Sequence, residues 1–260
     1  MAFEVPGGAG FRPVPQQRIR AKMDEYMSRR DYAGAERHLL YWLEEALQGN
    51  DLRGQLMIRN ELIGHFRKVG NREQALENAD RAIDLLERLD FGGTVSAGTT
   101  YVNAATAMSA FGENEKALDL FQKARAAYAS GARADHSLLG GLCNNMALAC
   151  VALGRFDEAY ALYDEAMDHM AQAPNGALEQ AITCLNIANA LEAQLGMEAA
   201  EGRIFERLDR ASELLADPGI PHDGYYAFVC EKCAPSFEYY GYFMEAEHLK
   251  QEAGRIYEGT

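Results

Sequence analysis

The chain has 260 residues, of which 48% are hydrophobic and 25% are charged. This composition excludes an intrinsically disordered protein, because so many apolar residues need burial. The formal net charge is −14, with 25 Lys and Arg against 39 Asp and Glu. Such a charge repels phosphate backbones and anionic lipid surfaces, so we predict neither a nucleic-acid partner nor a membrane partner.

The cysteines and the N-terminal segment indicate a protein that stays inside the cell. Five cysteines are an odd number at low density, unlike the framework of a disulfide-rich secreted domain. No apolar run approaches the roughly 18 residues of a membrane-spanning helix, and the N-terminal segment lacks the apolar core of a signal peptide. We therefore expect reduced thiols and a cytoplasmic protein.

A repeat of 42 residues dominates the sequence. Gly70, Gly112, Gly154 and Gly196 each follow the previous glycine by 42 residues, and alanines stand five and twelve residues after the first three of them. Apolar residues recur at helical spacing on both sides of each glycine. Each unit is therefore predicted to be a helix, a tight turn and a second helix, in which the glycine ends the first helix in a left-handed conformation.

In chain order, a leader precedes six such units. Residues 1–15, rich in proline and glycine, are predicted to be a flexible leader, and residues 16–260 a single array of repeats. With this period, each helix is expected to hold about 15 to 18 residues. Glu201 stands where the fifth unit should have an alanine, which predicts that its second helix is shifted by a residue or two. The predicted repeats span about 16–50, 53–90, 96–130, 137–172, 178–216 and 224–258.

This pattern resembles the tetratricopeptide repeat, whose consensus has Leu, small, aromatic, Gly, small, aromatic and Ala residues at these relative positions. The usual period of that family is 34 residues, and the period of 42 is closer to the long-helix repeats of kinesin light chains. The segments 144–149 and 154–159 are especially similar to that subgroup. The resemblance implies an all-α fold, namely a right-handed α-α superhelix of about six repeats whose first helices line a concave groove.

The resemblance also indicates which residues face that groove, since first-helix positions nine and ten before the glycine point inward in this family. Asparagines recur there, and an asparagine side chain both donates and accepts hydrogen bonds, so a row of them can pair with the main chain of an extended peptide. The alternative is that these asparagines bridge neighbouring helices and satisfy one another. Arg67 and Thr106 are further candidates for the groove. One interpretation is that they contact an acidic ligand, and the other is that they are ordinary solvated side chains. The candidate asparagines are Asn60, Asn103, Asn144, Asn145 and Asn186.

We accordingly predict a non-enzymatic scaffold that binds an extended peptide or a partner protein in its groove. The alternative function is a peptide-sensing regulatory subunit that acts on a separate effector chain, similar to bacterial quorum-responsive tetratricopeptide regulators. Asp24 and Glu61 stand where the clamp of chaperone-binding tetratricopeptide domains has asparagine. Binding of chaperone tails is therefore not predicted.

Catalytic, cofactor and metal sites are not predicted. Cys230 and Cys233 have the Cys-x-x-Cys spacing of zinc sites, with His222 and His248 on either side, but no second cysteine pair exists. No two of the six histidines have the helical spacing of metal ligands. Cys230 and Cys233 are instead predicted to be two thiols one turn apart, partly packed against the neighbouring unit, and Cys143, Cys150 and Cys184 are predicted to be core residues.

Aromatic residues crowd the last 36 positions. Part of this cluster must fill the last layer between helices. The exposed remainder is predicted to form a homodimer contact or a pocket for a partner, because tyrosine suits sites that are buried at one end and wet at the other. The C-terminal aromatic cluster comprises Tyr225, Tyr226, Phe228, Phe237, Tyr239, Tyr240, Tyr242 and Phe243.

Overall fold

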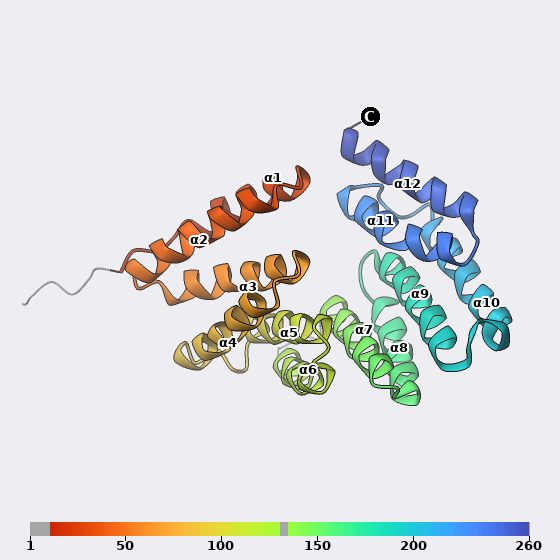
Figure 1. The fold of residues 1–260 in the computed structure, drawn as a ribbon, viewed down its shortest axis with the longest axis horizontal. Helices are drawn as coiled ribbons and strands as arrows, with labels where there is room; N and C mark the ends of the chain where they lie inside the picture. Colours follow the sequence, from red (N-terminus) through yellow and green to blue (C-terminus); the bar gives the residue numbers. More distant parts are fainter. Residues whose placement is uncertain (1–10, 131–134, 260) are drawn as a thin grey trace, which may run out of the picture. The chain divides into compact units, whose positions relative to one another are not determined.

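The computed structural model describes residues 11–130 and 135–259. In these ranges the chain forms twelve α-helices and no strand (Figure 1). The helices divide between two compact units, residues 1–132 (unit 1) and 133–260 (unit 2), with three helix hairpins in each. Within the described ranges, no helix combines the length and the apolar character that crossing a membrane requires.

Unit 1 is a row of three hairpins. Each odd-numbered helix packs on the even-numbered helix that follows it, α2 and α4 pack on the next hairpin, and α3 also packs on α5. Ala75, Ala79 and Ala82 of α4 are fully buried, and such small side chains let neighbouring helices approach while Phe66 and Phe121 fill the remaining space. The helices of unit 1 are α1 (Gln16–Ser28), α2 (Tyr32–Gln48), α3 (Leu52–Lys68), α4 (Arg72–Arg88), α5 (Val95–Ala110) and α6 (Asn114–Ala129).

Unit 2 is also a row of three hairpins, with longer helices in its middle hairpin. There α10 begins directly after Gly196, whereas α4, α6, α8 and α12 begin two residues after their turn glycine. As a result Ala200 is buried and Glu201 is exposed, so the predicted shift of this helix is confirmed. The helices of unit 2 are α7 (His136–Ala152), α8 (Phe156–Met170), α9 (Gly176–Leu195), α10 (Met197–Leu215), α11 (Gly224–Tyr239) and α12 (Phe243–Glu258).

The turns inside the hairpins have the conformation that the sequence predicts. The five turn glycines of the second to sixth hairpins have φ between +72° and +86°, and Arg30 takes the same left-handed region in the first hairpin with φ +54°. In every hairpin but the fifth, the residue after the turn residue then bonds back to the first helix, as when the Asn71 amide donates to the Phe66 carbonyl oxygen at 2.8 Å. This Schellman arrangement satisfies carbonyl groups that the end of a helix would otherwise leave unpaired.

Residues just before α1 are bonded to the turn between α2 and α3. The amide of Arg12 donates to the carbonyl oxygen of Gly49 at 2.9 Å, and that of Val14 donates to Asp51 Oδ2 at 2.9 Å. Asp51 is only 3% exposed, and its Oδ1 also accepts from the Gly54 amide at the start of α3. Residues 12–14 therefore belong with the folded unit, and the first ten positions of the predicted leader lie outside the described residues.

All five cysteines are buried, and Cys143, Cys150 and Cys184 lie in the core as predicted. Burial raises the pKa of the Cys230 thiol to about 11 and that of Cys233 to about 12. His222, which the sequence places near this pair, instead stacks on the Tyr226 ring at 4.1 Å between centroids and has its Nδ1 3.1 Å from Glu252 Oε2. The Cys-x-x-Cys spacing is therefore accounted for by two buried thiols one turn apart.

Candidate functional site

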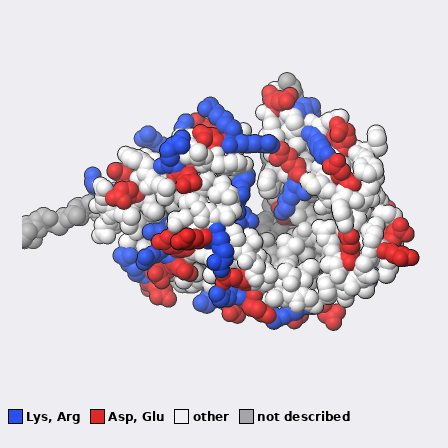
Figure 2. All heavy atoms as spheres, in the orientation of Figure 1, with Lys and Arg blue, Asp and Glu red and all other residues white. Residues whose placement is uncertain are grey.

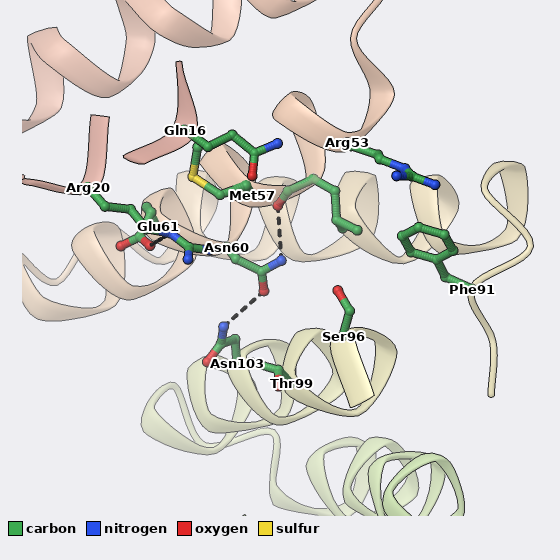
Figure 3. Close-up of a pocket in the computed structure, with 11 residues that line it drawn as sticks. Gln16, Arg20, Arg53, Met57, Asn60, Glu61, Phe91, Ser96, Thr99 and Asn103 are labelled. Carbon is green, nitrogen blue, oxygen red and sulfur yellow. Dashed lines mark hydrogen bonds and ion pairs between the residues drawn. The ribbon is translucent and has the colours of Figure 1, made fainter. Parts of the chain in front are cut away.

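The first helices of unit 1 line a groove made of two adjoining cavities. The larger has a volume of about 510 Å³ and the smaller about 290 Å³, and they share Asn60, Glu61 and Asn103. We call these two cavities the unit 1 groove. The smaller cavity adds Met23, Asp24, Met27, Gly64, His65 and Lys68. The larger, drawn in Figure 3, adds Gln16, Arg20, Arg53, Leu56, Met57, Phe91, Ser96 and Thr99.

Two asparagines at the centre of the groove connect α3 to α5. Asn103 Nδ2 donates to Asn60 Oδ1 at 2.9 Å (Figure 3). Asn60 Nδ2 in turn donates to the carbonyl oxygen of Leu56 at 2.9 Å and to Thr100 Oγ1 at 3.0 Å. Within the described part of the chain, Asn103 Oδ1 accepts no hydrogen bond. Asn60 is thus engaged within the protein, whereas Asn103 retains an acceptor at the groove.

The corresponding asparagines of unit 2 connect α7 to α9 in the same way. Asn144 Nδ2 donates to Thr183 Oγ1 at 2.7 Å, and Asn186 Nδ2 donates to Asn144 Oδ1 at 3.1 Å. Asn144 is only 5% exposed, whereas the adjacent Asn145 is half-buried. These contacts favour the bridging alternative for Asn60, Asn144 and Asn186, and ligand binding by Asn103 and Asn145 stays a prediction.

The other two candidate residues lie away from the groove. Arg67 is exposed in the last turn of α3, and the Thr106 hydroxyl donates to the Val102 carbonyl oxygen of its own helix at 2.7 Å. Arg53, which the sequence analysis missed, lines the larger cavity. The signal that points to it is helical spacing: Met57 follows Arg53 by four residues, and Asn60 and Glu61 follow Met57 by three and four, so all four lie on one side of α3.

Both signs of charge are present in the groove. Arg20 Nε lies 3.7 Å from Glu61 Oε1. Burial raises the pKa of the Glu61 carboxyl group, Arg20 opposes this rise and Asp24 adds to it. The Arg53 guanidinium lies over the Phe91 ring at 5.4 Å from the centroid. On the face shown in Figure 2, positive and negative side chains of unit 1 are interspersed. The groove therefore suits a ligand with mixed polar groups better than a uniformly charged one.

Unit 2 has a smaller cavity of about 300 Å³ beside its aromatic residues. It is lined by residues of α7, by the connection between α8 and α9, and by Tyr225, whose hydroxyl group donates to the Glu179 carboxylate. Within the C-terminal aromatic cluster, Tyr226, Phe237 and Tyr240 are buried, which confirms that part of the cluster fills the core. A homodimer contact stays a prediction for its exposed members, Tyr225, Phe228, Tyr239 and Phe243.

The sequence of part of the chain matches one family of helix-hairpin repeats, in agreement with the hairpins and the turns described above. Residues 55–130 match the tetratricopeptide repeat. This segment of the chain therefore carries tetratricopeptide repeats. Among curated protein sequences, none matches the chain. The match agrees with the predicted resemblance, and the all-α helical-repeat fold class is confirmed.

Three solved structures are similar to this chain in fold. Nearly identical TPR-like repeats of a putative kinesin light chain from Podosopora anserina match with 18% identity and a TM-score of 0.53, over 78% of this chain and 94% of that one. BtubC (BKLC) from P. vanneervenii matches with 17% identity and a TM-score of 0.51, over 95% of this chain and 92% of that one. A Rap protein complexed with Competence and Sporulation Factor matches with 14% identity and a TM-score of 0.58, over 95% of this chain and 66% of that one.

Proposed function

We propose that this tetratricopeptide-repeat protein is a non-enzymatic scaffold whose unit 1 groove binds an extended segment of a partner protein. The observation that carries the proposal is the groove itself, in which the half-buried Asn103 has an unused acceptor beside the hydroxyl groups of Ser96 and Thr99. An extended segment presents its own N–H and C=O groups to such side chains.

The apolar wall of the groove suits side chains of varied shape. Met23, Met27 and Met57 line it together with Leu56. Methionine is flexible and polarisable, so it adapts to different apolar partners. A volume of about 510 Å³ also lies in the range of sites that hold small ligands or a few side chains. We expect the bound segment to place one or two apolar side chains here.

The charges of the groove add a preference for one acidic residue. Arg53 is exposed at one end of the larger cavity, and Arg20 is only loosely paired with Glu61, at 3.7 Å. A planar guanidinium group binds a carboxylate through two parallel hydrogen bonds. The Rap protein of the comparisons, solved with Competence and Sporulation Factor, is an example of a similar fold with a bound ligand.

A binding selection tests this proposal. Peptides are selected from a random library on the purified chain, and their affinities are measured by fluorescence anisotropy. We expect Ser96→Trp, which fills the larger cavity, and Arg53→Glu, which reverses a charge at its edge, each to weaken binding by at least about tenfold, or 1.4 kcal/mol. Lys123→Glu is the matched control, because Lys123 is exposed on α6, which contributes no residue to the groove.

Unchanged affinity in both groove variants would contradict the proposal. The same complexes address the alternative of a peptide-sensing regulatory subunit. Small-angle scattering of the free and the peptide-bound chain should coincide for a scaffold, whereas a sensor must change its conformation to act on an effector chain.

A further inference from the structure

The fourth hairpin brings together three side chains with metal-binding atoms. Cys143 of α7 and Glu165 and His169 of α8 each contribute one ligand atom, and these three atoms lie within 4.8 Å of one another. Glu165 Oε1 is 3.7 Å from His169 Nε2. The whole cluster lies within unit 2.

Helical spacing explains how the cluster forms. Glu165 and His169 are four residues apart, so they share one face of α8, and the hairpin packs that face against α7. His136 and Cys143 are seven residues apart and likewise share a face of α7. The sequence shows no pair of histidines at ligand spacing because the ligands are of three different types and lie on two helices.

We propose that Cys143, Glu165 and His169 bind a divalent transition-metal ion, with zinc as the preferred ion. Thiolate, imidazole and carboxylate are the three ligand types of protein zinc sites, and a thiolate selects zinc over calcium or magnesium. Ligand atoms in a tetrahedral zinc site lie about 3.3 to 3.8 Å apart, as bond lengths of about 2.0 to 2.3 Å require. The pair Glu165–His169 is already at this separation, and the others need to close by about 1 Å at most.

His136 positions the histidine ligand. Its Nδ1 lies 3.0 Å from Nδ1 of His169. When His169 binds the ion through Nε2, the atom that faces Glu165, its Nδ1–H donates to His136. Histidines that bind metals are generally oriented by such a second hydrogen bond, which fixes the tautomer and the ring plane. His136 is therefore a positioning residue rather than a ligand.

The burial of the cluster suits an ion with one open position. Cys143 is 1% exposed, whereas the side chains of His169 and Glu165 are 20% and 34% exposed. The thiolate thus lies at the inner end and solvent has access from the outer end. Three protein ligands leave the fourth position to water, and binding releases the thiol proton to solvent. The ion connects α7 to α8 and should stabilise unit 2.

Cobalt titration of the full-length chain tests the proposal, with Co²⁺ as the spectroscopic probe and Zn²⁺ as its competitor. We expect one Co²⁺ per chain, visible absorption of tetrahedral intensity and a thiolate-to-cobalt charge-transfer band, all displaced by Zn²⁺. Because the thiol must lose its proton, affinity should rise as the pH rises. Excess Zn²⁺ should also raise the Tm of the chain.

Matched substitutions locate the site. Cys143→Ala and His169→Gln should each lower the affinity by more than about 100-fold, and Cys143→Ala should remove the charge-transfer band. His136→Ala should keep the band and lower the affinity by about 10 to 100-fold, whereas His136→Gln, which retains an acceptor, should recover most of it. Cys150→Ala is the control, because it removes another buried thiol of α7.

Several outcomes would overturn the proposal: no binding of either ion, binding without the charge-transfer band, or equal binding by the Cys143→Ala and His169→Gln variants. Loss of the band in a Cys230→Ala, Cys233→Ala double variant but not in Cys143→Ala would place the ion at the other cysteine pair and would equally overturn it. Circular dichroism of each variant establishes that the helices are retained.

Discussion

Asparagine amides connect the first helices of neighbouring hairpins in both units. Asn60 links α3 to α5 through Thr100 and Asn103, and Asn144 links α7 to α9 through Thr183 and Asn186. An amide suits this position because it donates to one neighbour and accepts from another. Mid-helix asparagine has poor helix propensity, so these hydrogen bonds offset a local cost.

We expect Asn144→Ala to lower the free energy of unfolding by about 1 to 3 kcal/mol, since it leaves the Asn186 amide without its acceptor and removes the donor to Thr183 Oγ1. Asn145 is adjacent in sequence and half-buried, and Asn145→Ala should change the free energy of unfolding by less than about 0.5 kcal/mol. Urea denaturation of both variants measures the difference. Equal effects of the two substitutions would show that the bridge in unit 2 contributes nothing to stability.

The hairpin is the structural element of this chain, and its turn sets how its two helices meet. Gly112 ends the first helix of the third hairpin with φ +83°, and the next amide, that of Glu113, bonds back to the Met108 carbonyl oxygen at 2.9 Å. A Cβ added at Gly112 would meet no atom within 4 Å. The requirement for glycine is therefore conformational and does not come from packing.

Gly64 provides a matched comparison in the same unit, because it also has no atom within 4 Å of an added Cβ but lies inside α3. We expect Gly112→Ala to destabilise the chain by about 1 to 2 kcal/mol through left-handed strain. Gly64→Ala should stabilise it by about 0.5 to 1 kcal/mol, since alanine is the better helix former. Urea midpoints that move in the same direction for both variants would refute this account of the turns.

At the scale of the whole molecule, the chain consists of two compact units of three hairpins each. Each unit has its own buried residues, such as Ile58, Leu62 and Phe121 in unit 1 and Leu142, Tyr163 and Phe237 in unit 2. In repeat proteins each hairpin contacts only its neighbours, and about three hairpins suffice to bury a continuous core. Each unit therefore has the elements of an independently folding domain.

We expect residues 11–130 and 135–259, expressed as separate chains, each to retain native helical content and to unfold cooperatively, because three hairpins remain intact in both. Far-ultraviolet circular dichroism during thermal unfolding measures this. A fragment that shows no cooperative transition at any temperature would mean that its core depends on the rest of the chain.

The features that the sequence reveals are those with local causes. The 3.6-residue recurrence of apolar side chains marks the helices, and glycine at 42-residue intervals marks the turns, because helix propensity and left-handed backbone conformation depend on a few adjacent residues. In the first hairpin, Arg30 stands at the position of the turn glycine and has φ +54°. The burial of Ala200 in place of Glu201 follows from the same kind of spacing.

Partnerships between side chains, by contrast, were decided by the tertiary structure. The sequence placed Asn60 and Asn103 on one predicted surface, but only the packing of α3 against α5 decides that they bond to each other and that Asn103 retains an acceptor. Likewise, nothing in the spacing of Cys143 and His169 brings them together until α7 and α8 close into a hairpin. The sequence by itself determined the helices, the turns and the repeat, since these depend on local conformation. The groove and the cluster of metal-binding atoms depend on how helices distant along the chain pack side by side.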